Sequence, residues 1–218
     1  MLNMNFNTRS VIFWDQQDWL KSPLAGVYRK PLEREAAEHG HVTSIVKYEA
    51  KSYFNEHSHP LGEEIFVLEG TFSDETGDFG PGTYIRNPPG SKHKPFSHEG
   101  CVIFVKLNQF HSDDKDFLRI NTHQTEWLPG AGNLQVMPLH NFAGQNTALV
   151  KWPKNEIFQP HRHLGGEEIF VIDGEFIDEH GSYPKYTWLR NPHNSQHHPK
   201  VEQETLILVK TGHLAQDL

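Results

Sequence analysis

Two histidines, a carboxylate and an apolar run that ends at a glycine stand together in the stretch His57-Ser58-His59-Pro60-Leu61-Gly62-Glu63-Glu64-Ile65-Phe66-Val67-Leu68-Glu69-Gly70. The same arrangement returns in His161-Arg162-His163-Leu164-Gly165-Gly166-Glu167-Glu168-Ile169-Phe170-Val171-Ile172-Asp173-Gly174. Because residues i and i+2 of a β-strand point to the same face, the two histidines of each copy would project together. The chain is therefore predicted to be organised around two metal ions, one in each half.

The two stretches belong to a repeat of domain length. A shift of 104 positions aligns Thr43–Lys106 with Thr147–Lys210 without a gap, and about 27 of the 64 aligned residues are identical. A repeat of this length is a whole domain rather than one unit of a solenoid. We place the boundary in the polar stretch His111–Lys115, which predicts an N-terminal domain at residues 1–112 and a C-terminal domain at residues 113–218.

The composition is that of an ordinary globular protein. Apolar residues make up 36% of the 218 positions and charged residues 22%. The net charge of −8 argues against nucleic acid and anionic membranes as partners, because both attract basic patches. The single cysteine, Cys101, excludes an intrachain disulfide and a cysteine-based zinc site. No signal peptide or apolar membrane span is apparent, so we expect a cytoplasmic protein.

The local sequence signals are those of short strands separated by turns. The turns contain Asp78-Phe79-Gly80-Pro81-Gly82 and Asn87-Pro88-Pro89-Gly90. Helix signals are few: Leu32–Glu38 could form a short helix or a turn, and its counterpart in the second half is shorter. Many short strands with regular turns predict an all-β sandwich or barrel. Strands are predicted at Thr43–Tyr48, Ile65–Leu68, Thr71–Ser73, Thr83–Arg86 and Val102–Leu107, with Ile65–Leu68 and Thr71–Ser73 forming a tight hairpin around Glu69-Gly70.

A further histidine for each site is expected from far along the chain. His93 follows the turn at Pro88-Pro89-Gly90, and His197 is its partner in the repeat. Imidazole and carboxylate suit Fe(II), Mn(II), Zn(II), Ni(II) and Cu(II), and four protein ligands leave open positions on a five- or six-coordinate ion. Such positions admit water, O₂ or a chelating substrate. The predicted metal ligands are His57, His59, Glu63 and His93 in the first half, and His161, His163, Glu167 and His197 in the second.

Neighbouring residues compete for these roles. Glu64 and Glu168 are rivals of Glu63 and Glu167, and His198 is a rival of His197. A lone His-x-His pair is more often a surface feature than a metal site. The recurrence of all four ligands at one constant offset favours the metal site.

Other aligned residues receive structural interpretations. For Arg86 and Arg190 a salt bridge is favoured over contact with an anionic ligand. Asp74 and Asp178 are interpreted as turn residues rather than catalysts, and Cys101 as a buried, inert thiol.

With these residues in place, the chain resembles a bicupin. Both opening stretches match the first cupin motif, H-x-H-x(3,4)-E-x(6)-G, and the second motif, G-x(5)-P-x-G-x(2)-H, is matched by Gly82, Pro88, Gly90 and His93. In the second copy Tyr186 and Asn194 replace the two glycines of that motif. The family's leading glycine, six residues before the first histidine, is replaced by Lys51 and Asn155. Asn194 is expected to preserve its turn, whereas Tyr186 puts the second loop in question.

Within the cupins, the sequence of the segments Gly62–Glu75 and Tyr84–His93 is similar to that of the ChrR-like cupin family. This resemblance implies two tandem double-stranded β-helix barrels of the jelly-roll type. It also implies one divalent metal ion in each barrel, held by the three histidines and the glutamate. Fe(II), Zn and Mn are the expected ions, with Ni as a further candidate.

The resemblance leaves three functions open. The cautious one is a metal-binding ChrR-like bicupin, the second a non-haem dioxygenase for a small diketone or hydroxyketone, and the third a metal- or oxidant-responsive, anti-sigma-like module. A sigma-binding domain of this family is helical with a His/Cys zinc site, and the chain has no cysteine pair, which argues against a sigma factor as partner. The partner expected is a small-molecule ligand or substrate, and a homodimer is among the states that the sequence allows. If one site alone does chemistry, we expect the site at His57.

Overall fold

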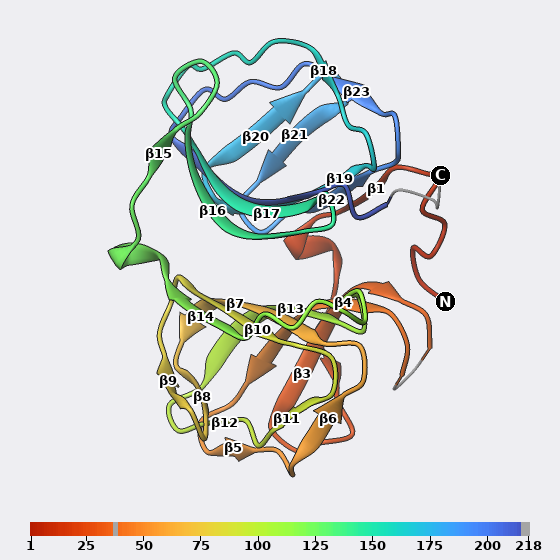
Figure 1. Cartoon of the computed structure of the whole chain (residues 1–218), viewed down its shortest axis with the longest axis vertical. Coiled ribbons are helices and arrows are strands. Elements are labelled where there is room, and N and C mark those ends of the chain that lie inside the picture. Colours follow the sequence, from red (N-terminus) through yellow and green to blue (C-terminus); the bar gives the residue numbers. More distant parts are fainter. Residues whose placement is uncertain (37–38, 215–218) are drawn as a thin grey trace. The chain divides into compact units, whose positions relative to one another are not determined.

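The computed structural model describes residues 1–36 and 39–214, which form two compact units of β-strands (Figure 1). The first unit comprises Met1–Met4 and Asp18–Thr125, and the second comprises Asn5–Gln17 and the chain from Glu126 onward. The all-β prediction is confirmed, because the only helices in the described ranges are two 3-10 turns, η1 (Trp14–Gln16) and η2 (Thr122–Gln124). No helix of those ranges has the length and apolar character that a membrane crossing requires.

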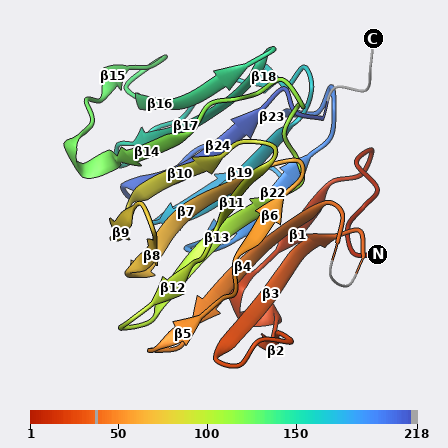
Figure 2. The same ribbon diagram turned by 60° about the horizontal axis from the view of Figure 1, so that its bottom comes forward.

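The first unit is built around a seven-stranded antiparallel sheet with the order β14-β10-β7-β13-β4-β3-β2. A four-stranded sheet, β5-β12-β8-β9, and the pair β11-β6 close the other side of the barrel (Figure 1), and Figure 2 shows the same strands in a turned view. The strands span Leu20–Lys21 (β2), Val27–Arg34 (β3), Val42–Tyr48 (β4), Ser52–Tyr53 (β5), His57–His59 (β6), Glu63–Gly70 (β7), Phe72–Asp74 (β8), Gly77–Phe79 (β9), Thr83–Asn87 (β10), Ser91–His93 (β11), Phe96–Ser97 (β12), Cys101–Leu107 (β13) and Leu118–Asn121 (β14).

The second unit repeats this plan with the sheet β1-β22-β19-β24-β17-β16-β15 and the pairs β18-β23 and β20-β21. Its strands span Ser10–Ile12 (β1), Leu128–Pro129 (β15), Gln135–Phe142 (β16), Gln145–Trp152 (β17), His161–Arg162 (β18), Glu167–Asp173 (β19), Glu175–Asp178 (β20), Gly181–Pro184 (β21), Trp188–Asn191 (β22), Gln196–His197 (β23) and Thr205–Thr211 (β24).

Two strands, β1 and β14, do not belong to the unit that their position in the sequence suggests. β1 precedes the first barrel along the chain but pairs with β22 of the second unit. β14 follows the predicted boundary but pairs with β10 of the first unit. The compact units are therefore interleaved along the chain, whereas the contiguous ranges 1–112 and 113–218 stay a prediction from the repeat.

Alternation along β7 decides which glutamate enters the barrel. Ile65 and Val67 are buried in the core of the first unit, together with Phe72. Because alternate residues of a strand share a face, Glu63 points to the same interior, and Glu64 points to the opposite face. The strand thus carries a carboxylate into a barrel that is otherwise lined by apolar residues.

The hairpin predicted around Glu69-Gly70 is wrong. β7 pairs with β10 and β13, whereas β8 pairs with β9 and β12. Gly70 has a φ of +68°, and a Cβ atom there would lie 2.1 Å from the carbonyl oxygen of Gly100. The glycine therefore lets the chain leave one sheet and enter the other, and does not form a tight turn between paired strands.

The helix or turn considered at Leu32–Glu38 is a strand up to Arg34. Residues 31 to 34 continue the pairing of β3 with β4 past a bulge between Pro31 and Glu33. The tertiary pairing overrides the helix-favouring composition of this segment. Residues 37 and 38 lie outside the described residues.

Candidate metal centres

The first centre is assembled by strands from two parts of the sequence. β6 and β11 pair so that His57 lies opposite His93 and His59 lies opposite Ser91. The three imidazole ring centres are 4.9 Å (57–59), 5.1 Å (57–93) and 4.8 Å (59–93) apart. Glu63 Oε2 lies 3.5 Å from Nε2 of His59 and 3.3 Å from Nε2 of His93. The three predicted histidines of the first half thus form one group, and Glu63 lies beside two of them.

The second centre has the same construction. β18 and β23 place His161 opposite His197. Nε2 of His197 lies 3.0 Å from Nε2 of His163 and 3.3 Å from Nε2 of His161. Glu167 Oε2 is 3.4 Å from Nε2 of His163 and 3.6 Å from that of His197. The four predicted ligands of the second half therefore converge on one point.

The chemistry of these donors fits a divalent cation. In the first centre Nε2 of His59 and Nε2 of His93 are buried without a hydrogen-bond partner among the described residues. Burial and the neighbouring His197 and His161 lower the pKa of His163 to about 3, so its imidazole is neutral at physiological pH. Neutral imidazole is the form that binds metals. Buried, facing lone pairs are costly without a cation between them.

The outer ring nitrogens of four histidines are anchored. Nδ1 of His57 lies 3.0 Å from the carbonyl oxygen of Asn55, and Nδ1 of His161 lies 3.0 Å from that of Gln159. A carbonyl oxygen only accepts, so each Nδ1 carries the proton and each Nε2 presents its lone pair to the centre.

The remaining anchors are Asp74 and Asp178, which the sequence predicts as turn residues only. Asp74 Oδ2 lies 3.4 Å from Nδ1 of His93, and Asp178 Oδ2 lies 3.5 Å from Nδ1 of His197. Burial raises the pKa of Asp74, but hydrogen bonds from His93 and Thr76 and the charge of Arg119 outweigh it and lower the pKa to about 2. Asp74 also accepts from the backbone N–H of Thr76 at 2.7 Å, so the turn interpretation is correct but incomplete.

The rival ligands point elsewhere. Glu64 lies 3.6 Å from the guanidinium of Arg86 and accepts from the hydroxyl of Tyr84 at 2.8 Å. Arg86 also pairs with Asp114, which confirms the structural salt bridge expected for this arginine. His198 is exposed, whereas His197 is buried in the second centre.

The lost glycines leave the second centre's loops intact. Tyr186 and Asn194 adopt φ angles of +66° and +61°, the left-handed conformation of Gly82 and Gly90 in the first half. Asn194 preserves its turn as expected. Tyr186 does the same at a cost of about 1–2 kcal/mol, the usual penalty for a side chain in this conformation.

A cavity of about 430 Å³ adjoins the first centre. This volume is within the range of small-molecule sites, roughly 300–1,000 Å³. It is lined by Arg29, His39 and Tyr48 together with the centre's His57, His59 and Glu63. Register assigns Val136 to the place of Arg29 in the second barrel, because Arg29 pairs with Val46 and Val136 pairs with the equivalent Val150. The first barrel therefore carries a cation in its cavity wall where the second has an apolar side chain.

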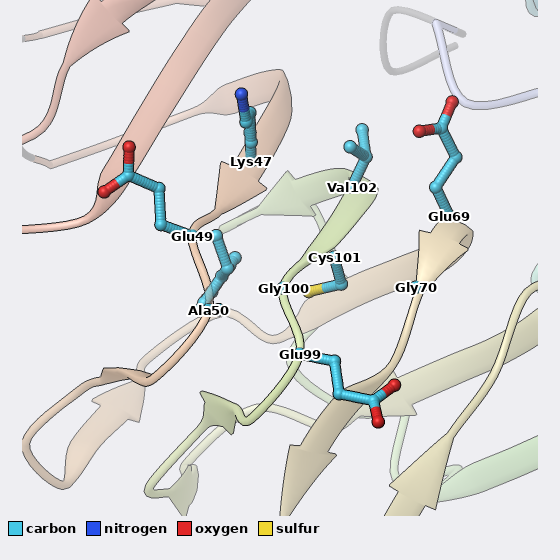
Figure 3. A pocket seen from close by; sticks show the side chains of 10 residues that line it. Lys47, Glu49, Ala50, Glu69, Gly70, Glu99, Gly100, Cys101 and Val102 are labelled. Carbon is cyan, nitrogen blue, oxygen red and sulfur yellow. The ribbon is translucent and has the colours of Figure 1, made fainter.

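Cys101 lies at a shallow depression on the same barrel (Figure 3). The carboxylates of Glu49, Glu69 and Glu99 border this depression but point away from one another in Figure 3. Burial raises the pKa of the Cys101 thiol to about 12, only partly offset by a hydrogen bond to Ser97. The interpretation of Cys101 as a buried and unreactive residue is therefore supported.

Comparison with known proteins gives the same fold for both halves. A family model described as ChrR Cupin-like domain matches residues 7–111 and again residues 115–215. No curated protein matches the sequence. Similar solved structures include a dioxygenase candidate from Nostoc punctiforme, with a TM-score of 0.78, 15% identity, and coverage of 97% of this chain and 85% of that one.

Two further solved structures share this architecture. A candidate glyoxylate-induced protein from Pseudomonas aeruginosa has a TM-score of 0.77 and 12% identity, with 100% of this chain and 93% of that chain covered. The pirin YhhW of Escherichia coli, solved with nickel(II), has a TM-score of 0.72 and 11% identity, with 94% and 98% covered. At these identities the likeness establishes the fold alone.

Proposed function

Because the chain belongs to the ChrR cupin-like family in both of its halves, we propose that each barrel binds one divalent metal ion and that the first barrel is a dioxygenase for a small diketone or hydroxyketone. The observation that carries this proposal is the convergence of His57, His59 and His93 beside a cavity of about 430 Å³. The ion would be held by these histidines and Glu63 and would supply open positions for a chelating substrate and O₂.

The walls of the cavity support this class of substrate. A diketone or hydroxyketone presents two neighbouring oxygens and becomes anionic when it loses the proton between or beside its carbonyl groups. Arg29 places a permanent positive charge in the cavity wall and favours that anionic form. Val27, Val46 and Ile103 line the same cavity and suit the apolar ends of such a molecule.

Oxygen uptake tests the reaction. Metal-free protein is reconstituted anaerobically with Fe(II), Mn(II), Zn(II) or Ni(II), and oxygen consumption is followed with a panel of diketones and hydroxyketones. We expect consumption of one O₂ for each substrate cleaved, with a carboxylic acid among the products and both oxygen atoms recovered in the fragments. Absence of uptake with every metal and substrate, in protein that holds two ions per chain, would contradict the dioxygenase and leave the metal sites standing.

Arg29→Met is expected to raise the KM for an anionic chelating substrate by about tenfold, with a smaller effect on kcat, because one charge-assisted contact of about 1.5–3 kcal/mol is lost. Steady-state kinetics of the reconstituted protein measure this. Lys21→Met is the matched control, since it removes one positive charge from the exposed strand β2. An unchanged KM in Arg29→Met, or an equal rise in both variants, would show that Arg29 does not contact the substrate.

A further inference from the structure

A chain of polar contacts links the glutamate and one histidine of the first centre from behind. Asn87 donates from Nδ2 to Glu63 Oε2 at 2.8 Å. Arg119 donates from Nη2 to Asn87 Oδ1 at 2.8 Å and to Asp74 Oδ2 at 3.3 Å. Asp74 in turn lies 3.4 Å from Nδ1 of His93. The guanidinium thus holds the partner of Glu63 and the partner of His93 at the same time.

The second centre has the same chain of contacts with a different arginine. Asn191 donates from Nδ2 to Glu167 Oε2 at 3.0 Å. Arg9 donates from Nε to Asn191 Oδ1 at 2.9 Å and from Nη2 to Asp178 Oδ2 at 2.8 Å. Asp178 lies 3.5 Å from Nδ1 of His197. Every member of the first chain therefore has a counterpart here.

The arginines come from the two segments of the chain that belong to the unit their sequence position does not suggest. Arg119 lies in β14, which belongs to the first unit although it follows that unit's other strands and leads into the second half. Arg9 directly precedes β1, which belongs to the second unit although it stands at the start of the chain. Arg119 of the first centre thus lies in the segment that precedes the second barrel in the sequence, and Arg9 of the second centre lies in the segment that precedes the first barrel.

The two arginines reach the same place from different positions. Leu118 lies opposite Arg86, and Ser10 lies opposite Arg190, the repeat partner of Arg86. Arg119 is one residue after Leu118 in β14, and Arg9 is one residue before Ser10, the first residue of β1, so the two stand two positions apart in equivalent segments. Positions two apart share a face. Both guanidinium carbons also lie 5.3 Å from the centre of an equivalent ring, Phe79 in the first unit and Tyr183 in the second.

We propose that Arg119 and Arg9 are positioning residues of the metal centres, with Arg119 orienting Glu63 and His93 of the first and Arg9 orienting Glu167 and His197 of the second. Arginine suits this task because its planar fork presents several donors in fixed directions, which lets one side chain bridge an amide and a carboxylate. Asn87 and Asn191 are 2% and 5% exposed, so water does not replace the lost contacts readily. The inference rests on the metal sites of the proposed function and not on the dioxygenase reaction.

The test measures metal affinity at one site at a time in the full chain. Two backgrounds are prepared: His163→Ala, which leaves the first centre, and His59→Ala, which leaves the second. Arg119→Met and Arg9→Met are introduced separately into each. Titration with Co(II) gives the affinity, and the visible absorption of the bound Co(II) reports on the ligand geometry independently of activity.

We expect a crossed pattern. Arg119→Met lowers Co(II) affinity by about 10–100-fold and changes the spectrum in the first-centre background, and Arg9→Met does so in the second-centre background, because supporting hydrogen bonds of metal ligands typically contribute that much. In the opposite combinations affinity and spectrum stay unchanged. Circular dichroism and thermal unfolding of the metal-free variants control for folding. Where a Met variant does not fold, the Arg→Lys variant at the same position replaces it, and the same loss of Co(II) affinity at one centre only is expected.

Three results would overturn the inference. The first is unchanged Co(II) affinity in all four combinations, and the second is an equal loss of affinity in both backgrounds. The third is tighter Co(II) binding at the centre that the arginine is proposed to orient, which would mean that the arginine acts there as a repelling charge. A different result, in which the two backgrounds bind no Co(II) with their arginines intact, would contradict the metal sites of the proposed function. The two failures are therefore distinguishable.

Discussion

His59→Ala is expected to lower the metal content from two ions to one per chain and to reduce oxygen uptake by at least about 100-fold, since the loss of one histidine ligand leaves a buried centre with too few donors. His59 is 4% exposed, and its Nε2 faces Glu63 at 3.5 Å. Elemental analysis of protein purified without added metal gives the stoichiometry, and the oxygen electrode gives the turnover.

The equivalent change in the other barrel is its control. His163→Ala is expected to remove one ion as well, because His163 occupies the same place against Glu167 at 3.4 Å. Its loss of turnover should be much smaller than that of His59→Ala, because the cavity with Arg29 adjoins the first centre. A larger loss in His163→Ala would transfer the proposed reaction to the second barrel, and an unchanged metal content in either variant would contradict the ligand assignment.

Phe72→Ala is expected to destabilise the metal-free protein by about 3–5 kcal/mol, the usual cost of deleting a buried aromatic side chain and leaving a cavity. Phe72 is 1% exposed and packs edge-on against Tyr48, with ring centres 6.0 Å apart. Its ring also lies 6.2 Å from that of His93, so the cavity would open beside a metal ligand. Urea unfolding followed by fluorescence measures the change in free energy.

Tyr53→Ala supplies the comparison for this change. Tyr53 is an aromatic residue of the same unit with 54% of its surface exposed, and its removal is expected to cost no more than about 1 kcal/mol. If Phe72→Ala and Tyr53→Ala shift the unfolding curve equally, the interior of the barrel is not the main source of stability in this unit.

Much of the fold and of the two centres could be predicted from the sequence because it depends on short-range order. The pairing of His57 with His59 follows from the period of a strand, and the repeat at 104 residues points to His161 and His163 by the same rule. The repeat also singled out His93 and His197, which lie far from the other ligands along the chain. The structure brings all of these residues together.

Contacts that depend on which strands pair could not be predicted from the sequence. The hairpin at Gly70 has suitable turn chemistry, but β7 and β8 belong to different sheets. Glu63 and Glu64 are adjacent residues of the same type, but their side chains lie on opposite faces of β7. Glu63 therefore contacts His93 of the centre, whereas Glu64 contacts Arg86. The turn residues at Gly70 therefore did not determine which strands pair on either side of it.

The sequence by itself determined two β barrels and the three histidines that converge in each, because spacing within strands and the repeat at 104 residues encode them. Only the tertiary structure decided which arginine hydrogen-bonds to the residues that contact each centre. Arg119 lies in β14 and Arg9 just before β1, two positions apart in register, so the offset of the repeat does not relate them. A hydrogen-bonded chain from Glu63 through Asn87 and Arg119 exists only once β14 has paired with β10.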